Sequence, residues 1–76
     1  GHKLKLKDID VVLTEWPETF VIGTGASGSM QVLPEVRHVL GNRGIHLIIM
    51  NTKEACEAFN EVHKSSRTVA ALHLTC

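Results

Sequence analysis

Hydrophobic and β-branched residues gather in three short runs along this chain, at 19–24, 45–50 and 68–75. Each run is continuous rather than alternating, which is typical of strands that are covered on both faces of a parallel sheet. Before each run, apolar residues recur at three- and four-residue spacing, a period that predicts helices. The sequence therefore predicts three buried strands, each preceded by an amphipathic helix.

Single residues place the boundaries of the helices. The first helix is predicted over 8–16 and ends before Pro17, because a residue that precedes proline is pushed out of helical geometry. Pro34 suits the first turn of the second helix, where its missing N–H costs nothing, and Thr52 is predicted to cap the third. The apolar faces expected to be buried are Leu6, Ile9, Val12, Leu13 and Trp16 in the first helix, Val36, Val39 and Leu40 in the second, and Ala55, Cys56, Phe59 and Val62 in the third.

The order of these elements predicts the fold class. Helix and strand alternate with short connections, which indicates an α/β fold with right-handed crossovers between parallel neighbours. We expect residues 1–76 to form a single small three-layer domain with a central mixed, mostly parallel sheet and flanking helices. Residues 1–7 would be a short strand or an extended lead-in.

Composition excludes several classes of function. The chain has 76 residues and a formal net charge of zero, with one tryptophan, two phenylalanines and no tyrosine. Nucleic-acid binding depends on Lys and Arg at the phosphates and on stacking aromatics, so no nucleic-acid partner is expected. No apolar run approaches the roughly 20 residues that span a bilayer, so no membrane partner is expected. Cys56 and Cys76 form no disulfide framework, which favours a reducing, cytoplasmic location.

A glycine-rich loop at 23–29 follows the first predicted strand and reads G-x-G-x-x-G. A dinucleotide fingerprint would place its third glycine inside the next helix and an acid after the next strand. Here Gly28 precedes Pro34 by several residues, and Asn51 follows the strand, so no cofactor is expected. The glycines are expected to allow sharp turns and close packing. A second interpretation is that the N–H groups of residues 24–29 cradle a small anion.

The remaining polar residues form no catalytic or metal-binding pattern. Cys56 lies on an apolar helix face and is expected to be a small buried hydrophobe, and His73 and Cys76 would face opposite ways in a strand. The histidines lack the spacing of metal ligands. Asn60 shares the face of Cys56 and is expected to hold the backbone of a neighbouring loop, for which the glycine loop is a candidate. We therefore expect no catalytic residue and no metal.

Three segments resemble a known family. They are Val21–Gly28, Thr52–Cys56 followed by Phe59 and Asn60, and Val69–Cys76. Together and in this order they are similar to the Mth-type domain of unknown function, which includes the human adipogenesis-associated domain protein and the mitochondrial complex I assembly factor 3. The resemblance covers essentially the whole chain. The family's signature positions correspond here to Gly23, Gly25, Thr52, Ala55, Asn60, His73, Thr75 and Cys76.

The resemblance implies a compact three-layer fold with a central mixed sheet, and it assigns no catalytic residue. Members of the family carry further residues, folded as extra strands, before the position of Gly1. The chain is therefore expected to lack the N-terminal strands of its family. Such a lack would expose apolar surface and sheet edges, which favours self-association.

Two functional hypotheses follow. The first is a non-catalytic binding or assembly module that acts through contacts with a protein partner, or a structural subunit whose partner supplies the missing strands. The alternative is a small-molecule or anion binder, or an enzyme, that uses the glycine-rich loop 23–29. The residues that these hypotheses place at a ligand or partner site are Gly23, Thr24, Gly25, Ala26, Ser27, Gly28, Asn60, His73 and Cys76.

Overall fold

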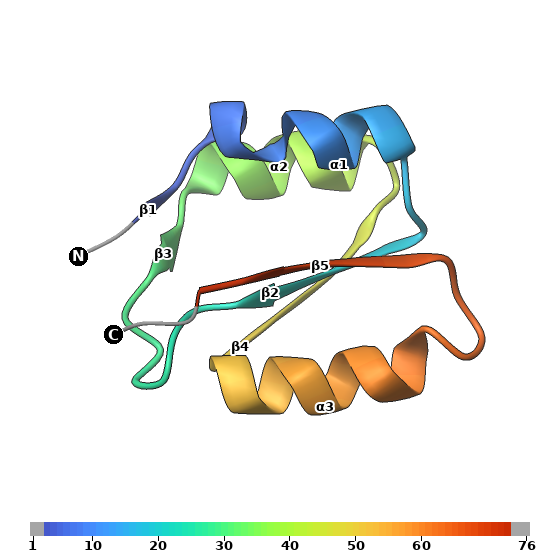
Figure 1. Cartoon of the computed structure of the whole chain (residues 1–76). Helices are drawn as coiled ribbons and strands as arrows, with labels where there is room; N and C mark the ends of the chain where they lie inside the picture. The colour runs from blue at the N-terminus through green and yellow to red at the C-terminus, as the bar shows by residue number, and fades with distance from the viewer. Residues whose placement is uncertain (1–2, 74–76) are drawn as a thin grey trace.

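Helices and short strands alternate along the computed structural model, which describes residues 3–73 (Figure 1). In chain order the elements are β1 (Lys3–Leu4), the 3₁₀ helix η1 (Leu6–Ile9), α1 (Asp10–Glu15), β2 (Thr19–Gly23), β3 (Gln31–Val32), α2 (Pro34–Asn42), β4 (His46–Met50), α3 (Thr52–Val62) and β5 (Thr68–Leu72). The alternation of helix and strand predicted from the sequence is confirmed for the three main strands and their helices.

Three strands form the central sheet in the order β4-β2-β5, and β1 and β3 form a separate two-stranded sheet. Every pairing between described strands is parallel, with Thr19 of β2 opposite His46 on one side and Thr68 on the other. The helices cover both faces of the central sheet: η1, α1 and α2 lie on one face and α3 on the other (Figure 1). The expected three-layer α/β domain is confirmed, and its described strands are parallel throughout.

The central strand β2 is the most deeply buried element of the fold, with all five of its residues buried. Phe20 and Ile22 are fully buried in the core cluster that includes residues of η1, α1 and α2. Because side chains alternate along a strand, Val21 points to the opposite face, which α3 covers. A strand with a helix layer on each side and a strand along each edge has no solvent face, which explains its continuous apolar sequence. The edge strands β4 and β5 are half-buried or exposed along their length, so the prediction of three buried strands is confirmed for β2 and wrong for these two.

The first helix departs from the prediction at both ends. It begins as the 3₁₀ turn η1, whose start is held by the backbone N–H of Lys5 donating to Asp8 Oδ2 at 2.9 Å. It ends at Trp16, whose left-handed φ of 46° turns the chain toward Pro17. The Trp16 side chain therefore lies outside, 52% exposed, with the Arg43 guanidinium 5.0 Å from its ring centroid. The prediction that Leu6 and Trp16 are buried is wrong, since both are exposed.

The third helix is capped by Asn51 rather than by Thr52. The side-chain oxygen of Asn51 accepts from the backbone N–H of Glu54 at 2.9 Å, which satisfies one of the free donors at the start of α3. Thr52 is consequently the first helical residue, and its hydroxyl forms hydrogen bonds with residues outside α3. The sequence prediction did not name Asn51 as the cap, because it treated Asn51 only as the residue that follows the apolar strand.

The outward half of α3 is less buried than its apolar pattern predicts. Ala55 is fully buried, but Cys56, Phe59 and Val62 are only half-buried. The reason is that α3 alone covers this face of the sheet, so no neighbouring helix shields its flanks (Figure 1). The expectation of a buried Cys56 is therefore wrong.

One further boundary and one strand pairing differ from the prediction. The last strand ends at Leu72, and its predicted end at Thr75 lies outside the described residues. The pairing of β1 with β3 was not predicted, because two-residue strands have no periodicity that could reveal them. Within residues 3–73, every helix is too short or too polar to cross a lipid bilayer.

Candidate functional site

The glycine-rich loop is fastened to the end of β4 by Thr24. The backbone N–H and the hydroxyl of Thr24 both donate to the carbonyl oxygen of Met50, each at 2.9 Å. The loop then turns tightly, with Gly28 N–H donating to the Gly25 carbonyl at 3.1 Å. Gly25 and Gly28 adopt φ of 100° and 72°, so the predicted role of these two glycines in a sharp turn is confirmed.

Thr52 joins the glycine loop to the end of β5. Its hydroxyl accepts from the backbone N–H of Gly25 at 2.8 Å and donates to the carbonyl oxygen of His73 at 2.5 Å. The backbone N–H of His73 in turn donates to the Gly23 carbonyl at 2.9 Å. The loop and His73, which the sequence grouped as one site, are thus brought together by a residue that the prediction assigned to helix capping.

Gly23 differs from Gly25 and Gly28 because a glycine is required there for its small size and not for its backbone conformation. It ends β2 without a positive φ. A Cβ at this position would lie 3.0 Å from Leu72 Cδ2 and 3.1 Å from both the Cα and the Oγ1 of Thr52. Close packing at Gly23 was predicted from the sequence and is confirmed, whereas the sharp turn predicted there is wrong, because Gly23 is the last residue of a strand.

Several backbone donors of the glycine loop are already used within the protein. The N–H groups of Thr24, Gly25 and Gly28 donate to Met50 O, Thr52 Oγ1 and Gly25 O respectively. These three groups belong to the cradle that the sequence proposed for an anion. The loop therefore offers an anion fewer donors than its sequence predicts.

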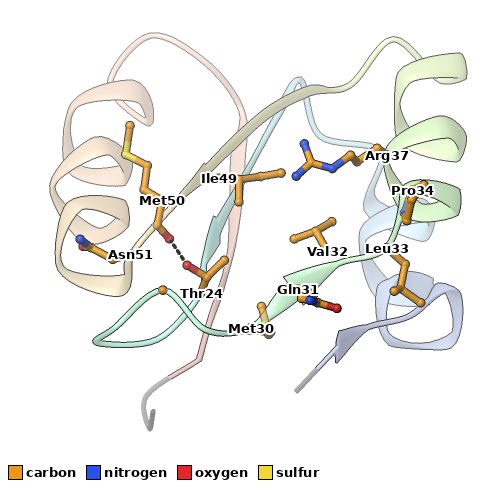
Figure 2. Close-up of a pocket in the computed structure, with 11 residues that line it drawn as sticks. Thr24, Met30, Gln31, Val32, Leu33, Pro34, Arg37, Ile49, Met50 and Asn51 are labelled. Carbon is orange, nitrogen blue, oxygen red and sulfur yellow. Dashed lines mark hydrogen bonds between the residues drawn. The ribbon is translucent and has the colours of Figure 1, made fainter. Parts of the chain in front are cut away.

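An open cleft of about 540 Å³ lies beside the glycine loop (Figure 2). Its walls come from the loop, β3, the start of α2 and the end of β4. The lining residues are Thr24, Gly28, Met30, Gln31, Val32, Leu33, Pro34, Arg37, Ile49, Met50 and Asn51. The volume falls within the range of about 300–1,000 Å³ that is common for sites of small organic ligands.

The topology of the sheet explains why the cleft opens at this place. The chain leaves the carboxyl end of β2 toward α2 on one face, whereas it leaves the neighbouring β4 toward α3 on the other face (Figure 1). Two adjacent parallel strands whose connections diverge in this way leave a crevice between their carboxyl ends, where α/β proteins commonly bind ligands. Thr24 and Met50 stand at the two strand ends that border the crevice.

Arg37 is the one charged residue among those that line the cleft. It lies one turn into α2 and is exposed, and Figure 2 shows its side chain reaching from the helix toward Ile49. The sequence prediction left Arg37 outside the apolar face of this helix and assigned it no role. The sequence could have indicated this role, because Arg37 lies in the first helix after the glycine loop. A helix that follows a parallel strand begins at the carboxyl edge of the sheet, where ligands commonly bind.

The other predicted site residues are spread more widely. Ala26 and Ser27 are exposed at the tip of the loop, and His73 is half-buried directly after β5. Asn60 is exposed in the second half of α3, away from the helix start that touches the loop, so it does not hold the loop as expected. Thr52 has that role because it stands at the end of α3 that meets Gly25. Cys76 lies outside the described residues.

The comparison with protein families identifies the chain's relatives. A family model described as "Protein of unknown function (DUF498/DUF598)" matches residues 1–74. The chain belongs to this family. The match agrees with the expectation of a family of unknown function, while the particular relatives expected from the resemblance stay a prediction. No curated protein matches the sequence.

A solved structure with the same fold comes from an archaeon. The crystal structure of a conserved hypothetical protein from Pyrococcus horikoshii OT3 is similar to this chain with a TM-score of 0.88 and 31% sequence identity. The similarity covers 99% of this chain and 62% of the archaeal protein. The chain therefore spans less than two thirds of the length of that neighbour.

Proposed function

We propose that this domain is a non-catalytic binding module that holds a small organic molecule in the cleft between β2, β4 and α2. The observation that carries the proposal is the position of the cleft at the diverging carboxyl ends of two parallel strands. Its lining supports the proposal, because apolar side chains such as Val32, Leu33 and Ile49 surround a few polar groups. This balance is typical of sites that enclose an organic ligand and orient it with a small number of hydrogen bonds.

The chemistry of the lining residues supports binding rather than catalysis. Among the described residues that line the cleft, none carries a carboxylate, an imidazole, a thiol or an amine. The one hydroxyl, on Thr24, is donated to the Met50 carbonyl. General acid–base catalysis needs a group that exchanges protons near neutral pH, and an arginine does not lose its proton under these conditions. The proposed cytoplasmic location, inferred from the reduced cysteines, stays a prediction.

Obstruction of the cleft gives a direct test. Gln31 is exposed at the wall of the cleft, so Gln31→Trp should fill space without disturbing the core. We expect small organic fragments to shift the backbone amide resonances of cleft residues in ¹⁵N-labelled protein. We expect Gln31→Trp to lower the fragment affinity obtained from these shifts about tenfold or more. Gln31→Ala, which leaves the cleft open, is the matched control and should retain fragment binding. Fragments that bind both variants equally, or shift no cleft resonance, would contradict the proposal.

A protein partner is the second proposal, and it follows from the apolar side chains that α1 exposes. Val11 of α1 is 71% exposed and Trp16, the C-cap residue of this helix, is 52% exposed, so both present apolar surface to a partner. We propose a second copy of this chain as the occupant, because a formal net charge of zero produces no overall repulsion between copies. An assembly role in a larger complex, which the resemblance implies, would be an additional use of this surface.

Self-association through α1 can be measured in solution. We expect size-exclusion chromatography with light scattering to show a molar mass that rises with protein concentration, up to twice that of the monomer. The double substitution Val11→Ser, Trp16→Ser should restore the monomer at all concentrations. Glu15→Ser, on the same helix, is the control and should leave association unchanged. If the unmodified chain stays monomeric up to several hundred micromolar, the second proposal is wrong.

A further inference from the structure

We propose that the ligand of the cleft is an organic anion, with one carboxylate or phosphate group that pairs with Arg37 and an apolar body that lies against β3 and β4. The inference rests on the proposed function, since it names the chemical class of ligand for the same cleft. Arg37 is exposed, and within residues 3–73 it is the sole charged residue that lines the cleft. A guanidinium presents a planar fork of N–H donors that matches the two oxygens of a carboxylate or phosphate.

No acidic residue of the described chain competes for this guanidinium. The described residues of the cleft wall include no Asp or Glu, and the only salt bridge within residues 3–73 joins Lys64 to Glu61 at the end of α3 opposite the loop. The side chain of Arg37 reaches into the space between α2 and β4 rather than along the helix surface (Figure 2). A positive charge held at the mouth of a cleft, without a carboxylate from the protein, favours a ligand that supplies one.

The start of α2 adds to the positive potential without competing for the anion's oxygens. Leu33 and Pro34 line the cleft, so the positive end of the helix dipole lies at its wall. Pro34 has no N–H, and the N–H groups of Val36 and Arg37 both donate to the Leu33 carbonyl. Of the backbone donors in this first turn, only the N–H of Glu35 has no acceptor within residues 3–73, so most direct hydrogen bonds to the anion come from the Arg37 side chain.

The rest of the lining defines the remainder of the ligand. Met30, Val32 and Ile49 offer an apolar surface, and Gln31 offers an amide at the rim. One guanidinium neutralises one anionic group, so a polyphosphate would leave further charge without a partner. The structure therefore favours a monocarboxylate or a phosphate monoester with an aliphatic or aromatic body small enough for a cleft of about 540 Å³.

Matched pairs of probes test this inference on the full chain. Phenylacetate and octanoate are titrated against their uncharged amides, and phenyl phosphate against phenol, with backbone amide shifts as the readout. We expect each acid to bind in the cleft about tenfold or more tightly than its neutral counterpart, and its affinity to fall as salt is raised. The carboxylate and phosphate arms show which oxyanion the site prefers.

Substitutions at Arg37 assign the effect to one side chain. Arg37→Gln should weaken the acids about tenfold or more and change the neutral probes by less than about twofold, while Arg37→Lys should retain part of the preference because it keeps the charge. Arg43→Gln, at the other end of α2, is the matched control and should bind the acids like the unmodified chain. Thermal unfolding of each variant shows that the fold is intact.

Different failures have different meanings. Neutral and acidic probes that bind the cleft equally, with no loss in Arg37→Gln, would overturn the anion inference and leave the proposed binding function standing. Acids that bind only outside the cleft would also overturn the anion inference. If neither acidic nor neutral probes bind in the cleft, the proposed function itself is overturned.

Discussion

Replacement of Gly23 by alanine is expected to lower the free energy of unfolding by about 2–3 kcal/mol. The backbone of Gly23 has no left-handed strain, so the cost arises from contact alone. The new Cβ would lie 3.0 Å from Leu72 Cδ2 and 3.1 Å from the Cα of Thr52. The leucine side chain can rotate, but the backbone of α3 must move away from the sheet. Urea-induced unfolding, followed by circular dichroism, measures the loss.

A second glycine of the same chain provides the control for this substitution. Gly41 lies within α2, and a Cβ added there would meet nothing within 4 Å. Gly41→Ala should therefore be neutral or raise stability by up to about 1 kcal/mol, because alanine loses less conformational freedom in a helix. If Gly23→Ala proved as stable as the unmodified chain, α3 and β5 would not be packed against the end of β2 as described.

Thr52→Val is the second substitution with a large expected effect. The hydroxyl of Thr52 accepts from Gly25 N–H and donates to the His73 carbonyl, and valine has the same shape without either function. Gly25 is buried, so its N–H would be left without an acceptor. We expect a loss of about 2–3 kcal/mol, because a buried polar group that loses its partner costs about 1–3 kcal/mol and a second hydrogen bond is lost with it.

The hydroxyl itself can be isolated by a conservative control. Thr52→Ser keeps the oxygen that serves both Gly25 and His73, so it should lose less than about 1 kcal/mol. Thermal unfolding is a suitable measurement, because 1 kcal/mol corresponds to a shift of about 4–8 °C for a domain of this size. A serine variant as unstable as the valine variant would show that the methyl group, and not the bridge, matters at this position.

The main elements of the fold could be predicted because each has a local cause. The run at 19–24 is apolar because β2 has a helix layer on both faces, and Pro34 begins α2 as expected. The errors occur where contacts between distant segments override local pattern. Trp16 lies on the apolar stripe of its helix but is turned outward by a left-handed backbone, and Cys56 is half-exposed because α3 has no neighbouring helix.

The cleft could not be predicted from the sequence in the same way. Its walls join Thr24, Arg37 and Ile49, which are brought together only once β2 is placed beside β4. The sequence showed the glycine loop, because its motif is local, and it missed the arginine, because an exposed charge on a helix has no distinctive pattern. A prediction of strand order would have placed the start of α2 at the carboxyl edge of the sheet and so pointed to Arg37.

The place of β2 in the sheet has a consequence for synthesis on the ribosome. Both partners of this strand, β4 and β5, come later in the chain than β2 itself. Translation therefore delivers the most deeply buried strand well before either of the segments that will flank it. Parallel pairing between distant segments is slow, and unpaired apolar strands are prone to aggregate. The strand β2 therefore stays without its partners, and exposed to aggregation, until β4 and β5 have been synthesised.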